Sequence, residues 1–457
     1  MSSDVSLSIL DLIGDTPILK LSSFDTGPCE LYVKLELQNP GGSIKDRIAL
    51  SIIEDAERSG QLVPGGTIIE ATAGNTGIGL ALVGALKGYR VILVIPDKMS
   101  REKIFHLEGL GASVVMTRSD VPEGHPEYYQ DLARAIASDT ADSFLANQFS
   151  NPSNPAAHRT QTAPEMWRQM DCDIDAVVTG VGSGGTITGL AEFLKEKNPQ
   201  IEMVVADPEG SIVADAVVKG HYCYEGGSWL VEGIGEDFIP DNLNLSLTDD
   251  AVVVSDKEAF QALDILLKRE GILGGSSTGT LIAGAVKWCK KQKVAKRVVT
   301  FVCDTGNKYL SKAYNKSWLH DNDLSGKISS GDLVDLINLR ADAGEMIAVT
   351  SADTLMTAYN RMRSADVSQI PVIDDSILVG VLDEEDLLKT VSYDRSAFSM
   401  PASKFMTTHL DILQKNASVD DVQRLLKEGK VAIIFDADIF LGFITKVDLI
   451  NYFRRLA

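Results

Sequence analysis

Over residues 67–301, short apolar runs rich in β-branched residues alternate with longer stretches of helical periodicity. Continuous apolar strands separated by helices are typical of parallel sheets that are covered on both faces. The pattern therefore predicts an α/β fold. The predicted strands are 67–70, 91–95, 114–116, 176–178 and 203–205, and the predicted helices follow Asn75, Ser100 and Thr186.

The pattern changes near residue 320, where a segment rich in Asn, Asp, Ser and Gly predicts a linker. Beyond it, the order helix, strand, strand, helix is predicted twice, ending in similar stretches at 378–388 and 441–450. A tandem repeat of about 60 residues explains this similarity, and the two copies are expected to pack as a pseudo-symmetric pair. The predicted domains are 1–318, a linker at 319–332, and repeats at 333–392 and 398–457.

The composition of the 457-residue chain excludes several classes of function. A net charge of −21 argues against a nucleic-acid partner. The most apolar stretch, 77–96, is interrupted by Lys87 and Arg90, so no membrane span is predicted. The five cysteines are scattered, which is typical of reduced thiols in a cytoplasmic protein. The six histidines do not fall at ligand spacing, so no metal site is expected.

Lys45 is predicted to lie in the first turn of a helix. Ser43 followed by Asp46 predicts an N-cap with a capping acid, and Gly60 predicts the helix end. The positive end of the helix dipole lowers the pKa of a nearby ammonium, and a depressed lysine pKa suits Schiff-base chemistry. An ordinary solvated lysine is the alternative, and these residues alone favour that alternative.

Three loops lead into predicted helices. In the first, Thr72, Asn75 and Thr76 gather hydrogen-bond donors, which suits either a carboxylate ligand or plain helix capping. The second, 179–186, combines glycines with hydroxyls, which suits a phosphate, although it matches neither the dinucleotide-binding nor the Walker pattern. The third, 274–279, in isolation predicts only a turn.

Taken together, a Schiff-base lysine, a carboxylate loop, a phosphate loop and a later hydroxyl are the parts of a pyridoxal-phosphate site. The sequence resembles the fold-type II (tryptophan synthase β-like) pyridoxal-phosphate enzymes and, among them, the haem-free cystathionine β-synthases. The resemblance covers nearly the whole chain, because the terminal repeats resemble a tandem pair of CBS domains. The motifs that carry it are 12–17, 41–47, 71–79, 182–186, 231–235 and 274–276.

The resemblance implies a role for each matching residue. Lys45 would bind pyridoxal phosphate covalently, Asn75 would contact its ring oxygen, and Ser276 would face its pyridine nitrogen. A neutral hydroxyl there makes the cofactor a milder electron sink, which suits β-replacement. The phosphate would be held by Gly182, Ser183, Gly184, Gly185 and Thr186, and the amino-acid substrate by Thr72, Ala73, Asn75, Thr76, Gln148 and Gly233.

The implied activity is that of a β-replacing lyase that joins L-serine, or an activated serine, to L-homocysteine in transsulfuration, with hydrogen sulfide-forming side reactions. An O-acetylserine-dependent cysteine synthase is the close alternative, and Ala73, where many members have serine, favours an acetylated donor. A non-catalytic sensor of adenosyl ligands is a remote alternative, because Lys45 and the phosphate loop are intact.

The resemblance also bears on haem, on regulation and on assembly. No haem is expected, because the catalytic similarity starts within the first dozen residues and 197–200 lacks a C-x-x-C motif. In the second repeat, Thr445 and Asp448 are placed to contact an adenosyl ligand, whereas the first repeat has four acidic residues at 383–386. Small-molecule amino-acid substrates and a homodimer or higher homo-oligomer are expected, without nucleic-acid or membrane partners.

Overall fold

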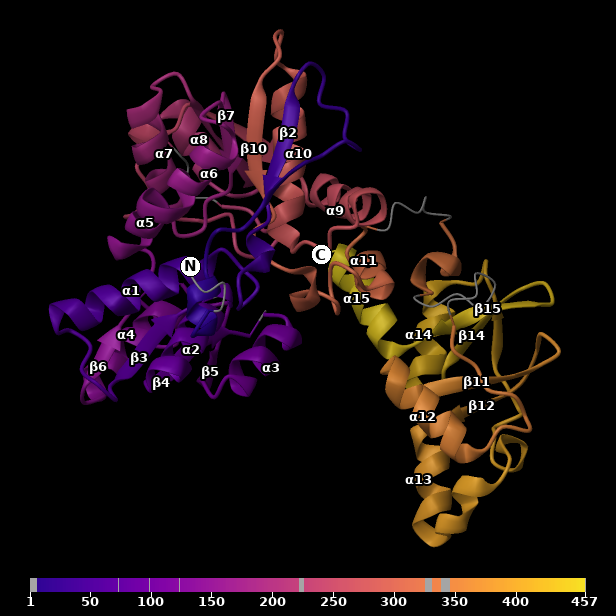
Figure 1. The fold of residues 1–457 in the computed structure, drawn as a ribbon. Coiled ribbons are helices and arrows are strands. Elements are labelled where there is room, and N and C mark those ends of the chain that lie inside the picture. Colours follow the sequence, from indigo (N-terminus) through magenta and orange to yellow (C-terminus); the bar gives the residue numbers. More distant parts are fainter. Residues whose placement is uncertain are drawn as a thin grey trace. The chain divides into compact units, whose positions relative to one another are not determined.

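The computed structural model describes residues 6–72, 74–97, 99–122, 124–221, 226–324, 331–337 and 346–456. The chain divides into two compact units, Met1–Asn315 and Lys316–Ala457. This boundary lies close to the predicted one, although the predicted linker begins inside a helix, α11 (Lys316–Asp321). The confirmed α/β fold is built from two parallel-stranded sheets in the first unit and a strand-and-helix repeat in the second (Figure 1).

The smaller sheet of the first unit has the order β5-β4-β3-β6, with every neighbouring pair parallel. Ile68 faces a core shared with helices α1 and α2, whereas its neighbour Ile69 faces helix α4, so both faces are covered as predicted. The strands are β3 (Thr67–Ala71), β4 (Arg90–Pro96), β5 (Ser113–Thr117) and β6 (Ser143–Leu145), and the helices are α1 (Lys45–Ser59), α2 (Asn75–Lys87), α3 (Arg101–Gly109) and α4 (Tyr129–Asp139).

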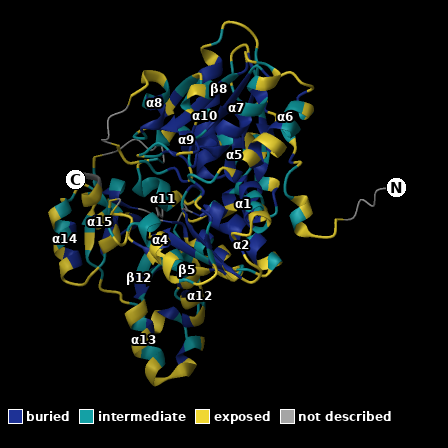
Figure 2. Cartoon of the chain, turned by 90° about the vertical axis from the view of Figure 1, so that its left-hand side faces the viewer, coloured by how far each residue is buried: buried dark blue, intermediate teal, exposed yellow. Residues whose placement is uncertain are grey.

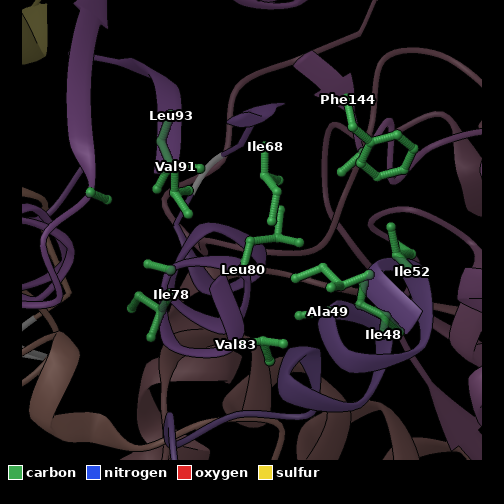
Figure 3. Close-up of a cluster of buried hydrophobic side chains, with 14 of the residues drawn as sticks. Ile48, Ala49, Ile52, Ile68, Ile78, Leu80, Val83, Val91, Leu93 and Phe144 are labelled. Atoms are coloured by element: carbon green, nitrogen blue, oxygen red, sulfur yellow. The ribbon is translucent and has the colours of Figure 1, made fainter. Parts of the chain in front are cut away.

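The core of this sheet fixes the starts of α1 and α2 beside each other. Ile48 and Ile52 of α1 belong to the same hydrophobic core as Ile78 of α2, and burying each such side chain contributes about 1.5–3 kcal/mol (Figure 3). At Gly79 a Cβ would lie 3.0 Å from the Lys45 carbonyl oxygen and 2.9 Å from the Ala49 Cβ. The small residues let the two helices approach closely, which brings Lys45 near the loop that opens α2.

The larger sheet has the order β1-β2-β10-β7-β8-β9, parallel throughout except for β1 against β2. Its central strands and helix α10 (Ser276–Lys290) are largely buried (Figure 2). Its strands are β1 (Ile18–Lys20), β2 (Glu30–Lys34), β7 (Ala176–Thr179), β8 (Glu202–Pro208), β9 (Asp250–Val254) and β10 (Arg297–Phe301). The accompanying helices are α5 (Ser153–Ala157), the π-helical turn η3 (His158–Thr162), α6 (Ala163–Gln169), α7 (Gly185–Lys197), α8 (Val213–Lys219), α9 (Asp256–Glu270) and α10 (Ser276–Lys290).

The starts of two helices differ from the sequence interpretation. The predicted cap of α1 is wrong: the Asp46 carboxylate accepts from the Gly41 amide at 2.5 Å, and the Ser43 hydroxyl oxygen accepts from the Lys45 amide at 3.2 Å. The turn at Gly42, whose φ is 74°, brings the Gly41 amide to the carboxylate. Helix α10 begins at Ser276, inside the segment interpreted as a turn.

The second unit repeats one arrangement twice, as predicted. Helix α12 (Leu355–Ala365), strands β11 (Gln369–Asp374) and β12 (Ile377–Asp383) and helix α13 (Glu384–Tyr393) form the first copy. After β13 (Ile412–Gln414), helix α14 (Val419–Lys427), strands β14 (Ala432–Asp436) and β15 (Ile439–Ile444) and helix α15 (Lys446–Leu456) form the second. Val381 of the first copy shares a hydrophobic cluster with Ile433, Phe440 and Phe443 of the second, so the copies pack on each other.

Two further properties concern the described ranges of the chain. No helix there combines the length and the apolar character that a membrane span requires. No group of three or more His, Cys, Asp or Glu side chains is arranged there to hold a metal ion.

Candidate active site

Asp304 connects both sheets of the first unit at the candidate site. Its Oδ2 accepts hydrogen bonds from Asn75 Nδ2 at 2.7 Å and from the Tyr309 hydroxyl at 2.6 Å. On the other side of the same amide, Lys308 Nζ donates to Asn75 Oδ1 at 2.9 Å and to the Gly41 carbonyl at 2.9 Å. An ammonium only donates and a carboxylate accepts, so the two charges fix the orientation of the Asn75 amide.

Lys45 is the first residue of α1 and lies beside this cluster. Burial lowers the pKa of its ammonium, against the opposing influence of Cys303 and Asp304, and the Lys103 ammonium lowers it further. In the part of the chain that the structure describes, no carboxylate or carbonyl accepts a hydrogen bond from its Nζ. The predicted depression of its pKa is thus present, but desolvation rather than the helix dipole is its largest cause. Such an amine suits Schiff-base formation.

The glycines of the predicted phosphate loop, between β7 and α7, leave no room for side chains. A Cβ at Gly182 would lie 2.7 Å from the Gly233 carbonyl oxygen, and one at Gly185 would lie 2.0 Å from Asn154 Oδ1. Gly184 has a φ of 79°, in the left-handed region that favours glycine. The loop opens helix α7, whose first amides and positive dipole end suit an anion, so its geometry fits a phosphate group.

Sequence reasoning missed two polar residues that lie behind this loop. Asn154 Nδ2 donates to Ser183 Oγ at 2.9 Å, and His158 Nε2 lies 3.2 Å from Thr186 Oγ1. Both are nearly or fully buried. The signal available in the sequence was their spacing of four residues, which places them on one face of a helix.

Ser276 begins helix α10 and is buried, with 3% of its surface exposed. Its Oγ accepts from the Glu232 amide at 3.0 Å. Because a hydroxyl carries one proton, that proton is left to be donated to a ligand, as an unprotonated pyridine nitrogen would require. Burial opposes ionisation of the Glu232 carboxyl, but Lys103 and Lys312, each at 2.7 Å, hold its pKa below the usual value.

The residues predicted to bind the substrate carboxylate come together around Gln148. Thr76 donates its hydroxyl to Gln148 Oε1 at 2.5 Å, and the Thr72 hydroxyl oxygen accepts from the Gly74 amide at 3.1 Å. Gly233 lies beside the phosphate loop at Gly182. The predicted contact Ala73 lies outside the described residues.

Glu70, at the end of β3, is a further buried group that sequence reasoning did not single out. Burial raises its pKa to about 8. Its Oε1 accepts from the Gln148 amide at 3.4 Å, and its Oε2 has no hydrogen-bond partner among the residues described. A protonated carboxyl therefore supports the backbone of Gln148.

The two residues predicted to contact a regulatory ligand are brought together at the start of α15. The Thr445 hydroxyl donates to Asp448 Oδ2 at 2.6 Å, and the Asp448 amide donates back to Thr445 Oγ1 at 3.4 Å. The first repeat has reciprocal backbone-to-side-chain bonds at the same positions: the Asp386 amide donates to Asp383 Oδ1 at 2.7 Å, and the Asp383 amide donates to Asp386 Oδ2 at 3.3 Å. Both pairs make the contacts of a helix-capping box.

Comparison with known proteins identifies the chemistry of this arrangement. Residues 9–304 match the family described as pyridoxal-phosphate dependent enzyme, and 343–393 and 402–455 match CBS domains. A cystathionine beta-synthase of Apis mellifera is 34% identical over 460 residues, spanning 98% of this chain and 90% of that protein.

Two further relatives are similar to the catalytic part. An O-acetylserine dependent cystathionine beta-synthase of Bacillus subtilis is 41% identical over 312 residues, which is 67% of this chain and 97% of that protein. The crystal structure of a hydrogen sulfide-producing enzyme from Fusobacterium nucleatum superposes with a TM-score of 0.62 and 37% identity, covering 67% of this chain and 100% of that one.

The predicted cofactor and fold are thereby confirmed. The closely packed glycines of the loop before α7 fit the phosphate of pyridoxal phosphate. The desolvated Lys45 amine fits its aldehyde, and the hydroxyl proton that Ser276 retains fits its ring. The enzyme is a pyridoxal-phosphate dependent β-replacing lyase with a C-terminal CBS-domain pair. Its similarity extends through both parts of the chain, so it belongs to the cystathionine beta-synthase family.

Proposed function

We propose that this enzyme joins L-serine, or an activated serine, to L-homocysteine to form L-cystathionine. In this β-replacement the bond between the serine β-carbon and its oxygen breaks, a bond to the homocysteine sulfur forms, and water leaves when serine is the donor. The observation that carries the proposal is the similarity to a cystathionine beta-synthase across the catalytic unit and the CBS pair together.

Pyridoxal phosphate supplies the electron sink that makes the α-proton of a bound amino acid removable. Lys45 would hold the resting cofactor and, once freed by the substrate, would be the base that accepts this proton. Its lowered pKa leaves more of the amine unprotonated near neutral pH than an exposed lysine would have. The same ammonium can return the proton to the departing oxygen.

Orientation of the substrate and the cofactor is assigned to the surrounding polar groups. Thr72, Thr76 and Gln148 would bind the substrate carboxylate, and the hydrogen bond between Thr76 and Gln148 places these two side chains next to each other. Asn75, fixed by Asp304 and Lys308, would contact the ring oxygen of the cofactor. The Ser276 hydroxyl would donate to the pyridine nitrogen and leave it uncharged, which would favour loss of the β-substituent.

O-acetylserine is the second candidate donor and sulfide the second candidate acceptor. The 41% identity to an O-acetylserine dependent relative and the similarity to a hydrogen sulfide-producing enzyme favour these substrates. The donor and acceptor are tested by measuring kcat/KM for serine and O-acetylserine, each paired with homocysteine and with sulfide. The proposal expects the highest value with homocysteine as acceptor, and a highest value with O-acetylserine and sulfide would identify a cysteine synthase instead.

We further propose a physiological setting for the enzyme. It acts in cytoplasmic transsulfuration for cysteine biosynthesis and assembles as a homodimer or a higher homo-oligomer. Light scattering coupled to size-exclusion chromatography measures the assembly directly, and a mass equal to one chain would contradict it.

The CBS pair is proposed to bind an adenosyl ligand at Thr445 and Asp448.

A further inference from the structure

Asn154 and His158 lie one helical turn apart, on the segment that runs from α5 into η3 behind the phosphate loop. Asn154 Nδ2 donates to the Gln148 carbonyl at 2.8 Å and to Ser183 Oγ at 2.9 Å. The carbonyl accepts only, so the amide orientation is unambiguous and the Ser183 oxygen is the acceptor. The single hydroxyl proton of Ser183 is therefore left for a ligand.

His158 makes the equivalent contact with the second hydroxyl of the loop. Its side chain is fully buried, with Nε2 3.2 Å from Thr186 Oγ1 and Nδ1 3.0 Å from Thr162 Oγ1. Burial, together with the nearby Arg47 guanidinium, lowers the pKa of this imidazole to about 3, so the ring is neutral. A neutral imidazole has one N–H, and two tautomers have to be distinguished.

The two tautomers of His158 differ in how many buried hydrogen-bond donors they leave unpaired. If Nδ1 carried the proton, the Thr162 hydroxyl would accept it, and the proton of that hydroxyl would have no acceptor within the described part of the chain. Thr162 is fully buried, so such an unpaired donor is unfavourable. If Nε2 carries the proton, Thr162 donates to Nδ1 and the ring donates to Thr186, and every buried donor is paired.

We propose that His158 is a positioning residue that donates from Nε2 to Thr186, so that the Thr186 hydroxyl proton points at the phosphate of the bound cofactor. The inference rests on the proposed phosphate-binding role of residues 182–186. Thr186 is partly exposed in the first turn of α7, where a ligand can reach it. A phosphate near neutral pH mainly accepts hydrogen bonds. Asn154 and His158 donate to the oxygens of Ser183 and Thr186, so both hydroxyl protons remain to be donated to the phosphate.

Two substitutions at His158 separate hydrogen bonding from packing. In His158→Gln the amide nitrogen takes the place of Nε2, whereas in His158→Asn it takes the place of Nδ1. The dissociation constant for pyridoxal phosphate is measured by titrating protein freed of cofactor, and the phosphorus resonance of the bound cofactor is recorded by NMR. We expect His158→Asn to weaken binding about 10- to 100-fold and to shift the resonance, and His158→Gln to stay within about threefold of the wild type.

A double-mutant cycle with Thr186→Val tests whether His158 acts through Thr186. His158→Asn should add little to the loss caused by Thr186→Val, because the hydroxyl it orients is absent. An equal effect of His158→Asn in both backgrounds, or none in either, would overturn the inference alone. Unchanged affinity in Thr186→Val would overturn the phosphate assignment as well.

Thr162 provides a milder test in case the histidine variants fold poorly. Thr162→Val removes the donor to Nδ1 and should weaken cofactor binding about threefold to tenfold, because the other tautomer becomes accessible. The matched control is Thr160→Val, which changes an exposed threonine on the same turn and should leave the affinity unchanged. Equal effects of the two substitutions would overturn the inference.

Discussion

The main-chain amide of Glu232 donates to the hydroxyl oxygen of Ser276 over 3.0 Å. This bond uses the serine oxygen as an acceptor and leaves its proton to be donated to a ligand. It also connects the start of α10 to the residue before Gly233, which is one of the residues proposed to bind the substrate. The Glu232 carboxylate nearby is held charged by Lys103 and Lys312, so a second carboxylate at position 276 would lie close to an anion.

Ser276→Ala should lower kcat/KM about 10- to 100-fold, because one hydrogen bond to the cofactor and one acceptor for a buried amide are lost. Ser276→Asp should protonate the ring nitrogen, stabilise a carbanionic state and reduce turnover further. Steady-state kinetics and the absorbance spectrum of the bound cofactor measure both effects. Ser277→Ala, a buried serine one position along the same helix, is the control for packing, and wild-type kinetics in both Ser276 variants would make this residue structural only.

Lys45→Ala should abolish the covalent linkage to the cofactor. Wild-type enzyme is expected to be yellow, with no Soret band of haem, and to trap the cofactor on Lys45 after borohydride reduction, as measured by peptide mass spectrometry. For the cofactor-free protein, the rate of linkage formation should rise with pH through a midpoint below 10.5, because burial lowers the pKa of this amine. A reducible linkage that persists in Lys45→Ala would assign the Schiff base to another lysine.

Glu70→Gln should stabilise the protein increasingly as the pH rises. Burial raises the pKa of Glu70 from 4.5 to about 8, so between these values the folded chain keeps a proton that the unfolded chain releases. The contribution of this group to stability is complete below 4.5 and is lost as the pH rises through about 8. The neutral amide avoids this loss, which amounts to a few kcal/mol as an order of magnitude.

Thermal unfolding of both proteins across this pH range measures the difference. The melting temperature of Glu70→Gln minus that of the wild type should grow from about pH 5 to about pH 8 and then level off. Glu108→Gln, on an exposed position of α3, provides the matched control and should give a small difference without this slope. A flat difference for Glu70→Gln would show that the carboxyl ionises normally in the folded protein.

The fold and the outline of the site follow from local sequence, whereas the supporting residues do not. The strands around Ile68 and the loop before α7 have strong local patterns, and the roles proposed for Lys45 and Ser276 come from the motifs that resemble those of the family. Asp304 shows what local patterns miss, because its partner Asn75 is 229 positions away. The cap predicted from Ser43 and Asp46 failed for a different, local reason: a turn brings the Gly41 amide close, and it offers the carboxylate a different donor.

The two CBS repeats should differ in ligand binding. Residues 383–386 place four carboxylates at the start of α13, of which Glu385 has Lys389 at 2.7 Å as a counter-ion. The remaining negative charge should repel the phosphates of ATP or AMP. It should not repel the positively charged sulfonium of a ligand such as S-adenosylmethionine. The second repeat has Thr445 and Asp448 at the equivalent position, so an adenosyl ligand should bind there.

Calorimetric titration of the full-length enzyme with S-adenosylmethionine, ATP and AMP tests this assignment. Asp448→Asn should weaken binding of the preferred ligand about tenfold or more, because a charged acceptor for the ribose hydroxyls is lost while a side chain of the same size still accepts from the Thr445 amide. Asp386→Asn changes the matching cap of the first repeat and should have a much smaller effect.

Equal losses in the two variants would mean that capping of either helix, rather than contact at Asp448, controls affinity. If none of the three ligands binds, the repeats serve contacts between subunits and the assigned site is vestigial.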